Sequence, residues 1–214
     1  MPYRNTGYNK LYNLFFADDP FLFHNSNSES SEYPWNILLD EKSTMNDVNK
    51  VAIDRGQESR LRALAYHTLN AKGSAVNSKE MLGIVVEVGL DEGLDVLACY
   101  EDGTARFISH AEKIIVWEAV TSQSAVLVKN LFEAGSQVVK NIGPWHKERL
   151  PPPGKGEIRI SFLVADGLYF GQGPFEVLEK DVLGGPMIRA ATQLMTFLIE
   201  KQQLNHAAGA KKLE

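Results

Sequence analysis

The residue types that most often carry catalysis or metal binding are present in this chain, but they do not form a recognisable catalytic pattern. The five histidines are scattered, with no HxxxH or HxH spacing and no partner cysteines; they are His24, His67, His110, His146 and His206. There is no GxSxG elbow, and the single cysteine, Cys99, lies in a β-rich run, where a cysteine is typically an inert, buried hydrophobic residue. We therefore predict no catalytic residue, no metal and no cofactor, and whether the chain is an enzyme stays open.

Two glycine-containing segments could bind an anion. Gly154-Lys155-Gly156 looks like a fragment of a P-loop, but it lacks the upstream glycine and the Ser or Thr, and it precedes a predicted strand instead of a helix. Gly184-Gly185 stands directly before Pro186 at the start of a predicted helix, where free backbone amides attract anions. A turn followed by a helix start also explains this second segment, so anion binding at Gly184 and Gly185 is a hypothesis beside a structural alternative.

Two loops rich in glycine, proline and aromatic residues are the best candidates for recognition. They are GPWHKERLPPPGKGE (143–157) and DGLYFGQGPF (166–175). Rigid aromatic rings supply contact area at a small entropic cost, and glycine lets the backbone approach a guest. We predict a site for a ligand or partner where the two loops meet, formed by Trp145, His146, Arg149, Tyr169, Phe170 and Gln172. In the structural alternative, Trp145 and Phe170 are deeply buried in the core and the two loops lie apart.

Two functions from different classes fit this site. The first is a non-catalytic binding protein that uses these loops, or an uncovered sheet face, to bind another protein. The second is a small-molecule-binding protein or an enzyme, with a pocket between the same loops and the last helix. Polar side chains that converge in a cleft would favour the second function, and a flat apolar patch would favour the first.

Composition and charge narrow the class of protein. The chain has 214 residues, of which 44% are hydrophobic and 23% charged, as in ordinary globular proteins. A formal charge of -5 gives no basic footprint for nucleic acid. The polar N-terminal segment lacks the apolar core of a signal peptide, and no apolar run is long enough to span a membrane. We expect a soluble, cytoplasmic protein that binds neither nucleic acid nor membrane; its partner and oligomeric state stay open.

The residues from Met81 to Glu118 predict the sheet that must position the loops. Short loops with an acidic residue followed by glycine, Asp91-Glu92-Gly93 and Glu101-Asp102-Gly103, separate β-rich runs and are typical of hairpins. They predict a four-stranded antiparallel meander, and 158–171 predicts a later hairpin. By the two-residue period, Leu82, Ile84, Val86, Val88 and Leu90 share one face of the first strand. We expect helices on one face of the sheet and partial cover on the other.

Apolar residues at helical spacing predict the helices around this sheet. We expect helices near residues 8–16, 44–53 and 58–72, and two long amphipathic helices, from Ser122 to Asn141 and from Pro186 to about Leu204. The predicted fold class is therefore α+β, with N-terminal helices and two long amphipathic helices packed on an antiparallel sheet. We divide the chain into an N-terminal helical segment (1–75), the sheet core (76–205) and a disordered tail (206–214). Residues 25–31 read as an exposed loop, and Leu213-Glu214 as a cloning remnant.

Overall fold

The computed structural model describes residues 1–23 and 32–210. The predicted loop at 25–31 and the last residues of the predicted tail lie outside these ranges. The helices are α1 (Thr6–Leu14), α2 (Pro20–Phe23), α3 (Trp35–Leu38), α4 (Met45–Ile53), α5 (Ser59–Ala71), α6 (Ser122–Val139), α7 (Phe175–Leu178) and α8 (Gly184–Ala210). The strands are β1 (Met81–Leu90), β2 (Gly93–Tyr100), β3 (Ala105–Ile108), β4 (Ile114–Trp117), β5 (Glu157–Val164) and β6 (Gly167–Pro174).

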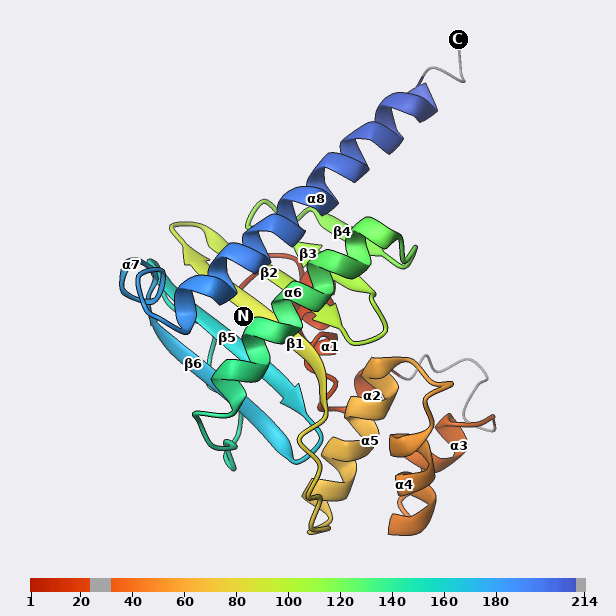
Figure 1. Ribbon diagram of the computed structural model, residues 1–214. Helices are drawn as coiled ribbons and strands as arrows, with labels where there is room; N and C mark the ends of the chain where they lie inside the picture. Colours follow the sequence, from red (N-terminus) through yellow and green to blue (C-terminus); the bar gives the residue numbers. More distant parts are fainter. Residues whose placement is uncertain (24–31, 211–214) are drawn as a thin grey trace.

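All strands belong to one six-stranded antiparallel sheet with the order β4-β3-β2-β1-β5-β6 (Figure 1). The predicted α+β class is confirmed, and so is the prediction that the meander and the later hairpin share one sheet. Gly93 and Gly103 have φ angles of 98° and 85°, a conformation that glycine adopts without a steric penalty and that these tight turns need. β2 and β1 are the central strands, and β4 and β6 are the edges.

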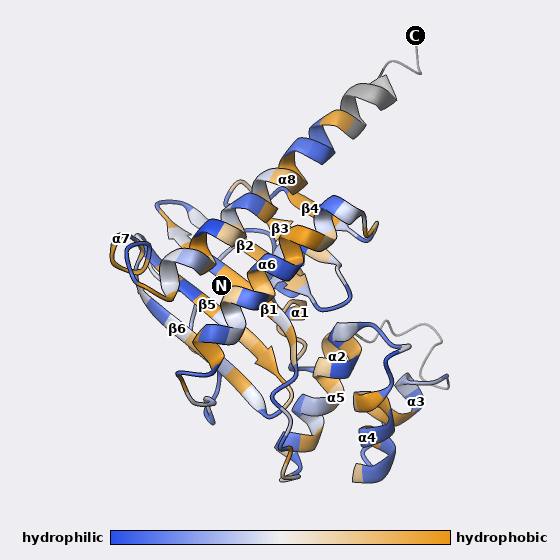
Figure 2. Cartoon of the chain, in the orientation of Figure 1, coloured by the Kyte–Doolittle hydropathy of each residue, from blue (hydrophilic) through white to orange (hydrophobic). Residues whose placement is uncertain are grey.

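Helices pack on both faces of the sheet, as the predicted fold class requires. α6 and α8 pack on one face, and the helices of the first 71 residues pack on the other, through α1 and α5 (Figure 1). Figure 2 shows hydrophobic residues along the central strands and hydrophilic residues on most of the connecting loops. The division of the chain near residue 75 stays a prediction.

The residues predicted to share one face of β1 do so except at the start of the strand. Ile84, Val86 and Val88 face α6 and α8 as expected, but Leu82 belongs to the core on the opposite side. The pairing of β1 with β5 shifts register between Met81 and Gly83. Because such an irregularity adds a residue to one strand, the alternation of side chains changes phase there, which no sequence pattern in this run predicts.

A buried ion pair joins the neighbouring strands β1 and β5 to α1. The Arg159 guanidinium donates through Nε and Nη2 to the two carboxylate oxygens of Glu87, at 2.6 and 2.7 Å, and Tyr12 Oη donates to Glu87 Oε1 at 2.7 Å. Glu87 is fully buried and Arg159 is 2% exposed. Arg159 Nη1 also donates to the carbonyl oxygens of Leu150 and Pro151. Nearly all the polar atoms are therefore satisfied, as a buried charge pair requires.

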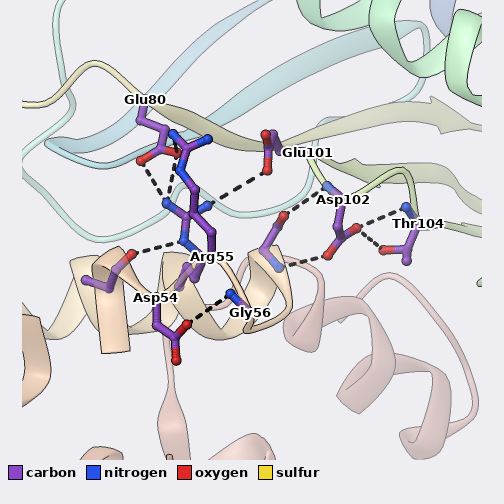
Figure 3. A network of polar contacts seen from close by, with 10 residues as sticks. Asp54, Arg55, Gly56, Glu80, Glu101, Asp102 and Thr104 are labelled. Atoms are coloured by element: carbon purple, nitrogen blue, oxygen red, sulfur yellow. Dashed lines mark hydrogen bonds and ion pairs between the residues drawn. The ribbon is translucent and has the colours of Figure 1, made fainter. Parts of the chain in front are cut away.

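A second polar network attaches α5 to the sheet (Figure 3). Arg62 donates to both carboxylate oxygens of Glu80, at 2.8 and 2.9 Å, and to the carbonyl of Ala52. The Asp102 carboxylate accepts from the Ser59 amide at 2.8 Å, while Ser59 Oγ accepts from the Asp102 amide at 3.0 Å. These reciprocal bonds hold the first turn of α5 against the turn between β2 and β3.

The two long helices sit on the opposite face of the sheet. Gly135 of α6 lies so close to the sheet that a Cβ atom there would be 3.1 Å from Ile84 Cδ1 and from Phe162 Cε1. The short helix α7 begins at Phe175, directly after β6. α8 continues to Ala210, past its predicted end near Leu204 and into the predicted tail, and its last turns project beyond the sheet (Figure 1). Among the described residues, no helix is long and apolar enough to cross a bilayer.

Candidate functional site

A cleft of about 500 Å³ opens on the α1 and α5 side of the sheet, where the loop after α6 passes the turn between β5 and β6. Four segments form its walls: residues 16–18 after α1, one side of α5, residues 145–149 of the loop, and residues 163–168 around the turn. No residue of α8 lines the cleft. This cleft is therefore not the pocket expected between the loops and the last helix; a smaller cavity of about 180 Å³, lined by Phe175 and by Ile188, Ala191 and Met195 of α8, lies on that other face.

α5 contributes one helical face to the cleft. Ala63, His67, Asn70 and Ala71 are spaced at i, i+4, i+7 and i+8, so their side chains point in the same direction. Asn70 Nδ2 donates to the carbonyl of Ala165 at 2.9 Å, which ties this face to the turn between β5 and β6.

His67 supplies a neutral imidazole to the cleft. Its ring is accessible to solvent, yet the cleft walls surround it, and this desolvation lowers its pKa below the ordinary value of 6.5. Asp18 acts in the opposite direction, and Arg149 adds to the lowering. At neutral pH the ring therefore presents one donor and one acceptor nitrogen.

Arg149 is held by α1 and its charge is already paired. Its Nε donates to Asp18 Oδ2 at 2.5 Å, and its Nη2 donates to Asn13 Oδ1 at 2.9 Å. The guanidinium lies 3.9 Å from the centre of the Phe16 ring. Ala17 adopts a φ of 49° between Phe16 and Asp18, in the left-handed region, so the chain turns sharply at this wall.

Trp145 anchors the loop to the edge strand. Its backbone amide donates to the Leu168 carbonyl at 2.6 Å, and its Nε1 donates to the Glu148 carbonyl at 2.9 Å. The Trp145 and Phe170 rings meet edge to face with centres 5.2 Å apart. The two loops therefore touch, and both rings are only partly buried, which contradicts the alternative in which they fill the core and the loops lie apart.

Lys79, Asp166 and Tyr169 form a polar cluster behind the turn between β5 and β6. Asp166 Oδ2 accepts from Lys79 Nζ at 2.6 Å and from Tyr169 Oη at 3.0 Å, and Lys79 Nζ also contacts Tyr169 Oη. Burial raises the pKa of the Tyr169 hydroxyl, so it stays protonated at neutral pH. The cluster fixes Asp166 at the cleft wall and neutralises its charge.

The structure divides the predicted site residues into two groups. Trp145, His146 and Arg149 line the cleft, but Tyr169, Phe170 and Gln172 do not. The Tyr169 side chain is fully buried in the core beneath α6 and α8, because alternate residues of β6 point to opposite faces. Phe170 packs against the Trp145 ring, and Gln172 donates to Glu157 Oε2 at 3.1 Å.

Sequence reasoning missed the half of the cleft that comes from the N-terminal helices. Phe16, Asp18, His67 and Asn70 carry no local motif, and the aromatic residues near α1 fit a core helix equally well. Their only signal is that His67 and Asn70 lie on the polar side of an amphipathic helix. Whether the polar side of a helix faces a loop that is distant in the sequence depends on tertiary packing.

The predicted anion site at the start of α8 is occupied from within the chain. The Gly184 amide donates to Asp181 Oδ1 at 2.7 Å, and the Gly185 amide donates to the Asp181 carbonyl at 2.9 Å. A Cβ atom on either glycine would lie 2.6 Å from a backbone carbonyl oxygen, so close packing explains both glycines. Neither amide is left for an external anion, and we withdraw this prediction.

Cys99 is fully buried, and burial raises its thiol pKa, which confirms that it is a core residue. Within residues 1–23 and 32–210, no group of three or more His, Cys, Asp or Glu side chains is arranged to hold a metal ion. Comparisons of the chain with protein-family models, with curated proteins and with solved structures find no match in any of the three.

Proposed function

We propose that this protein is a non-catalytic binding protein whose ligand is a small molecule held in the cleft between α1, α5 and the 145–149 loop. The observation that carries the proposal is the composition of that cleft. Apolar surface from Phe16, Leu163 and Leu168 lies beside polar groups from His67 and Asn70 in a volume of about 500 Å³. Ligand sites of proteins combine a mostly apolar lining with a few placed polar groups in this range of volumes.

The charges of the cleft favour a ligand with little net charge. The Arg149 guanidinium is paired with Asp18, and Asp166 is paired with Lys79. The His67 ring is neutral, and the exposed Lys147 and Glu148 offset each other. An apolar or aromatic ligand with neutral donors and acceptors therefore fits this cleft better than an acidic or phosphate-bearing ligand does.

Binding of another protein through the same loops is the competing proposal. A concave site supports a small ligand more than it supports a protein interface, which is usually flatter and larger. The rigid anchoring of Trp145 and Arg149 also supports a preformed pocket, because binding of a ligand then costs little conformational entropy for ordering the loop.

We also propose that the protein is cytoplasmic.

A fragment screen by ligand-observed NMR, repeated on two tryptophan variants, tests the proposal. Ala71 is exposed on α5 and lines the cleft, so Ala71→Trp fills the cleft without entering the core. We expect fragments that bind the wild-type protein to bind Ala71→Trp at least about tenfold more weakly, a loss of about 1.4 kcal/mol.

The matched control is Gln137→Trp, which adds the same ring to an exposed position of α6 on the other face of the sheet. Its fragment affinities should equal those of the wild-type protein. Equal affinities for Ala71→Trp, with its fold intact by circular dichroism, would refute the cleft as the binding site.

A further inference from the structure

The cavity of about 180 Å³ on the α6 and α8 side of the sheet has one wall made of strands. Paired residues from four neighbouring strands form this wall: Ile158, Val88 and Asp95 in one row, and Val86, Leu97 and Phe107 in the next. Because residues that pair across neighbouring strands point to the same face of a sheet, the two rows make one continuous surface.

The opposite wall is one side of α8, which lies across this face of the sheet (Figure 1). The lining residues of the helix are spaced at i, i+3, i+4 and i+7: Ile188, Ala191, Thr192 and Met195. Ala191 is buried, yet its side chain is a single methyl group, so it leaves space between α8 and the sheet that a leucine would fill. Phe175 of α7 completes the lining.

The lining is almost entirely apolar, and its two polar side chains already bond within the chain. Thr192 Oγ1 donates to the Ile188 carbonyl at 2.8 Å. Asp95 Oδ1 accepts from the His110 amide at 2.7 Å and lies 2.8 Å from His110 Nδ1. A ligand therefore gains mainly by burying apolar surface, and the Asp95 carboxylate repels a ligand with a negative charge.

The cavity is accessible without unfolding of the sheet. Leu97 and Ile158 are buried, whereas several other lining residues are half-buried or, in the case of Thr192, exposed, so the cavity opens to solvent on one side. The half-buried residues are Val88, Asp95, Phe175 and Met195. A methionine at this opening favours binding, because its unbranched side chain adapts to the shape of a ligand.

We propose that this cavity binds a small apolar molecule without a negative charge, about the size of a single aromatic ring. An engineered cavity of about 150 Å³ lined by leucine, isoleucine and phenylalanine binds benzene, and the present cavity has a similar volume and a similar lining. The proposal does not rest on the cleft, because the two sites lie on opposite faces of the sheet and share no residue.

Methyl NMR of the full chain, titrated with benzene and separately with benzoate, tests the proposal. Benzene should shift the methyl signals of Ile158, Ile188 and Met195 in a saturable manner, because these side chains line the cavity. Benzoate has the same ring with a carboxylate, and it should bind there at least about tenfold more weakly. The methyl signals of Leu163 and Leu168 report separately on the cleft, so failure at one site is distinguishable from failure at the other.

A pair of leucine variants of α8 provides the matched comparison. Ala191→Leu fills part of the cavity and should weaken benzene binding there at least about tenfold, without lowering the melting temperature. Gln193→Leu adds the same side chain at an exposed position of the same helix and should leave the affinity unchanged.

Three results would overturn the proposal. The first is a wild-type titration without saturable shifts at Ile158, Ile188 and Met195, which decides the question even if Ala191→Leu does not fold. The second is a folded Ala191→Leu variant that binds benzene as tightly as the wild-type protein does. The third is benzoate binding in the cavity that equals benzene binding.

Discussion

Charged residues in this molecule stabilise the fold by satisfying backbone groups as well as by pairing with other charges. Asp102 accepts hydrogen bonds from the Ser59 amide and from the amide and hydroxyl of Thr104. Desolvation alone would raise the pKa of its carboxyl, but the bonds from Ser59 and Thr104 outweigh it, so the pKa lies below the ordinary value of 3.8. The ionised form of Asp102 therefore stabilises the fold.

Asp102→Asn should lower the free energy of unfolding at pH 7 by about 2 kcal/mol, since hydrogen bonds to a charged group are lost. Because the folded pKa is lowered, the contribution of Asp102 is complete above the unfolded pKa and is lost as the pH falls through the folded pKa. The difference between wild type and variant should thus be constant from about pH 5 to pH 8 and shrink below about pH 4.

Urea denaturation between pH 2.5 and pH 8 measures this difference. The control is Glu41→Gln, an exposed carboxylate, which should change neither the stability nor its pH dependence. If the difference in free energy of unfolding between the wild-type protein and Asp102→Asn stays constant below pH 4, the ionised form of Asp102 does not stabilise the fold.

At the scale of elements, short-range chemistry predicts more than long-range packing does. The acidic residue and glycine at Glu92-Gly93 and Asp102-Gly103 predict the meander, because these turns need the positive φ that glycine supplies. The register shift at the start of β1 and the wall that α5 gives to the cleft have no such local cause. The place of Trp145 in the candidate site could be predicted, because a loop rich in glycine, proline and aromatic residues is recognisable from its composition. The place of His67 could not, because it lies in a helix without a local motif.

The contact of α6 with the sheet gives a prediction for one residue of that helix. Gly135→Ala gains about 1 kcal/mol of helix propensity. Overpacking costs about 1 to 3 kcal/mol, because the added methyl group would be 3.1 Å from a ring carbon of Phe162, which cannot bend away as the tip of Ile84 can. We expect a net destabilisation of about 1 kcal/mol for Gly135→Ala, and clearly more for Gly135→Val.

Thermal unfolding followed by circular dichroism checks the order of these variants. Gly143→Ala, where an added Cβ meets nothing within 4 Å, is the control for the general effect of replacing glycine near this helix. If Gly135→Ala is more stable than the wild-type protein, the helix does not pack as closely as described.

For the part of the molecule that the structure describes, the sheet separates two cores. Ile84 and Val86 of β1 face α6 and α8, while Val85 faces the N-terminal helices, so one central strand serves both cores. Loss of β1 would expose both apolar surfaces together. The molecule should therefore unfold as one cooperative unit, with β1 opening only in global unfolding.

Native-state hydrogen exchange measures this directly. Amides of β1, which is paired on both sides, should exchange with the free energy of global unfolding. The amides of Phe170 and Gln172, which point away from β5 at the edge of the sheet, should exchange faster than those of β1. Two separate groups of β1 amides with different opening free energies would show that the two cores unfold independently.

The ion pair between Glu87 and Arg159 also constrains the order in which the chain can fold while it is being synthesised. Its two members are separated by 72 residues, and α1 completes the pair through Tyr12. At a rate of about 5–20 residues per second, the ribosome needs roughly 4 to 14 s to add Arg159 after Glu87. During that interval β1 has an open edge and Glu87 has no counter-charge, so the earliest-made helix can reach its final position only after nearly the last strand has emerged.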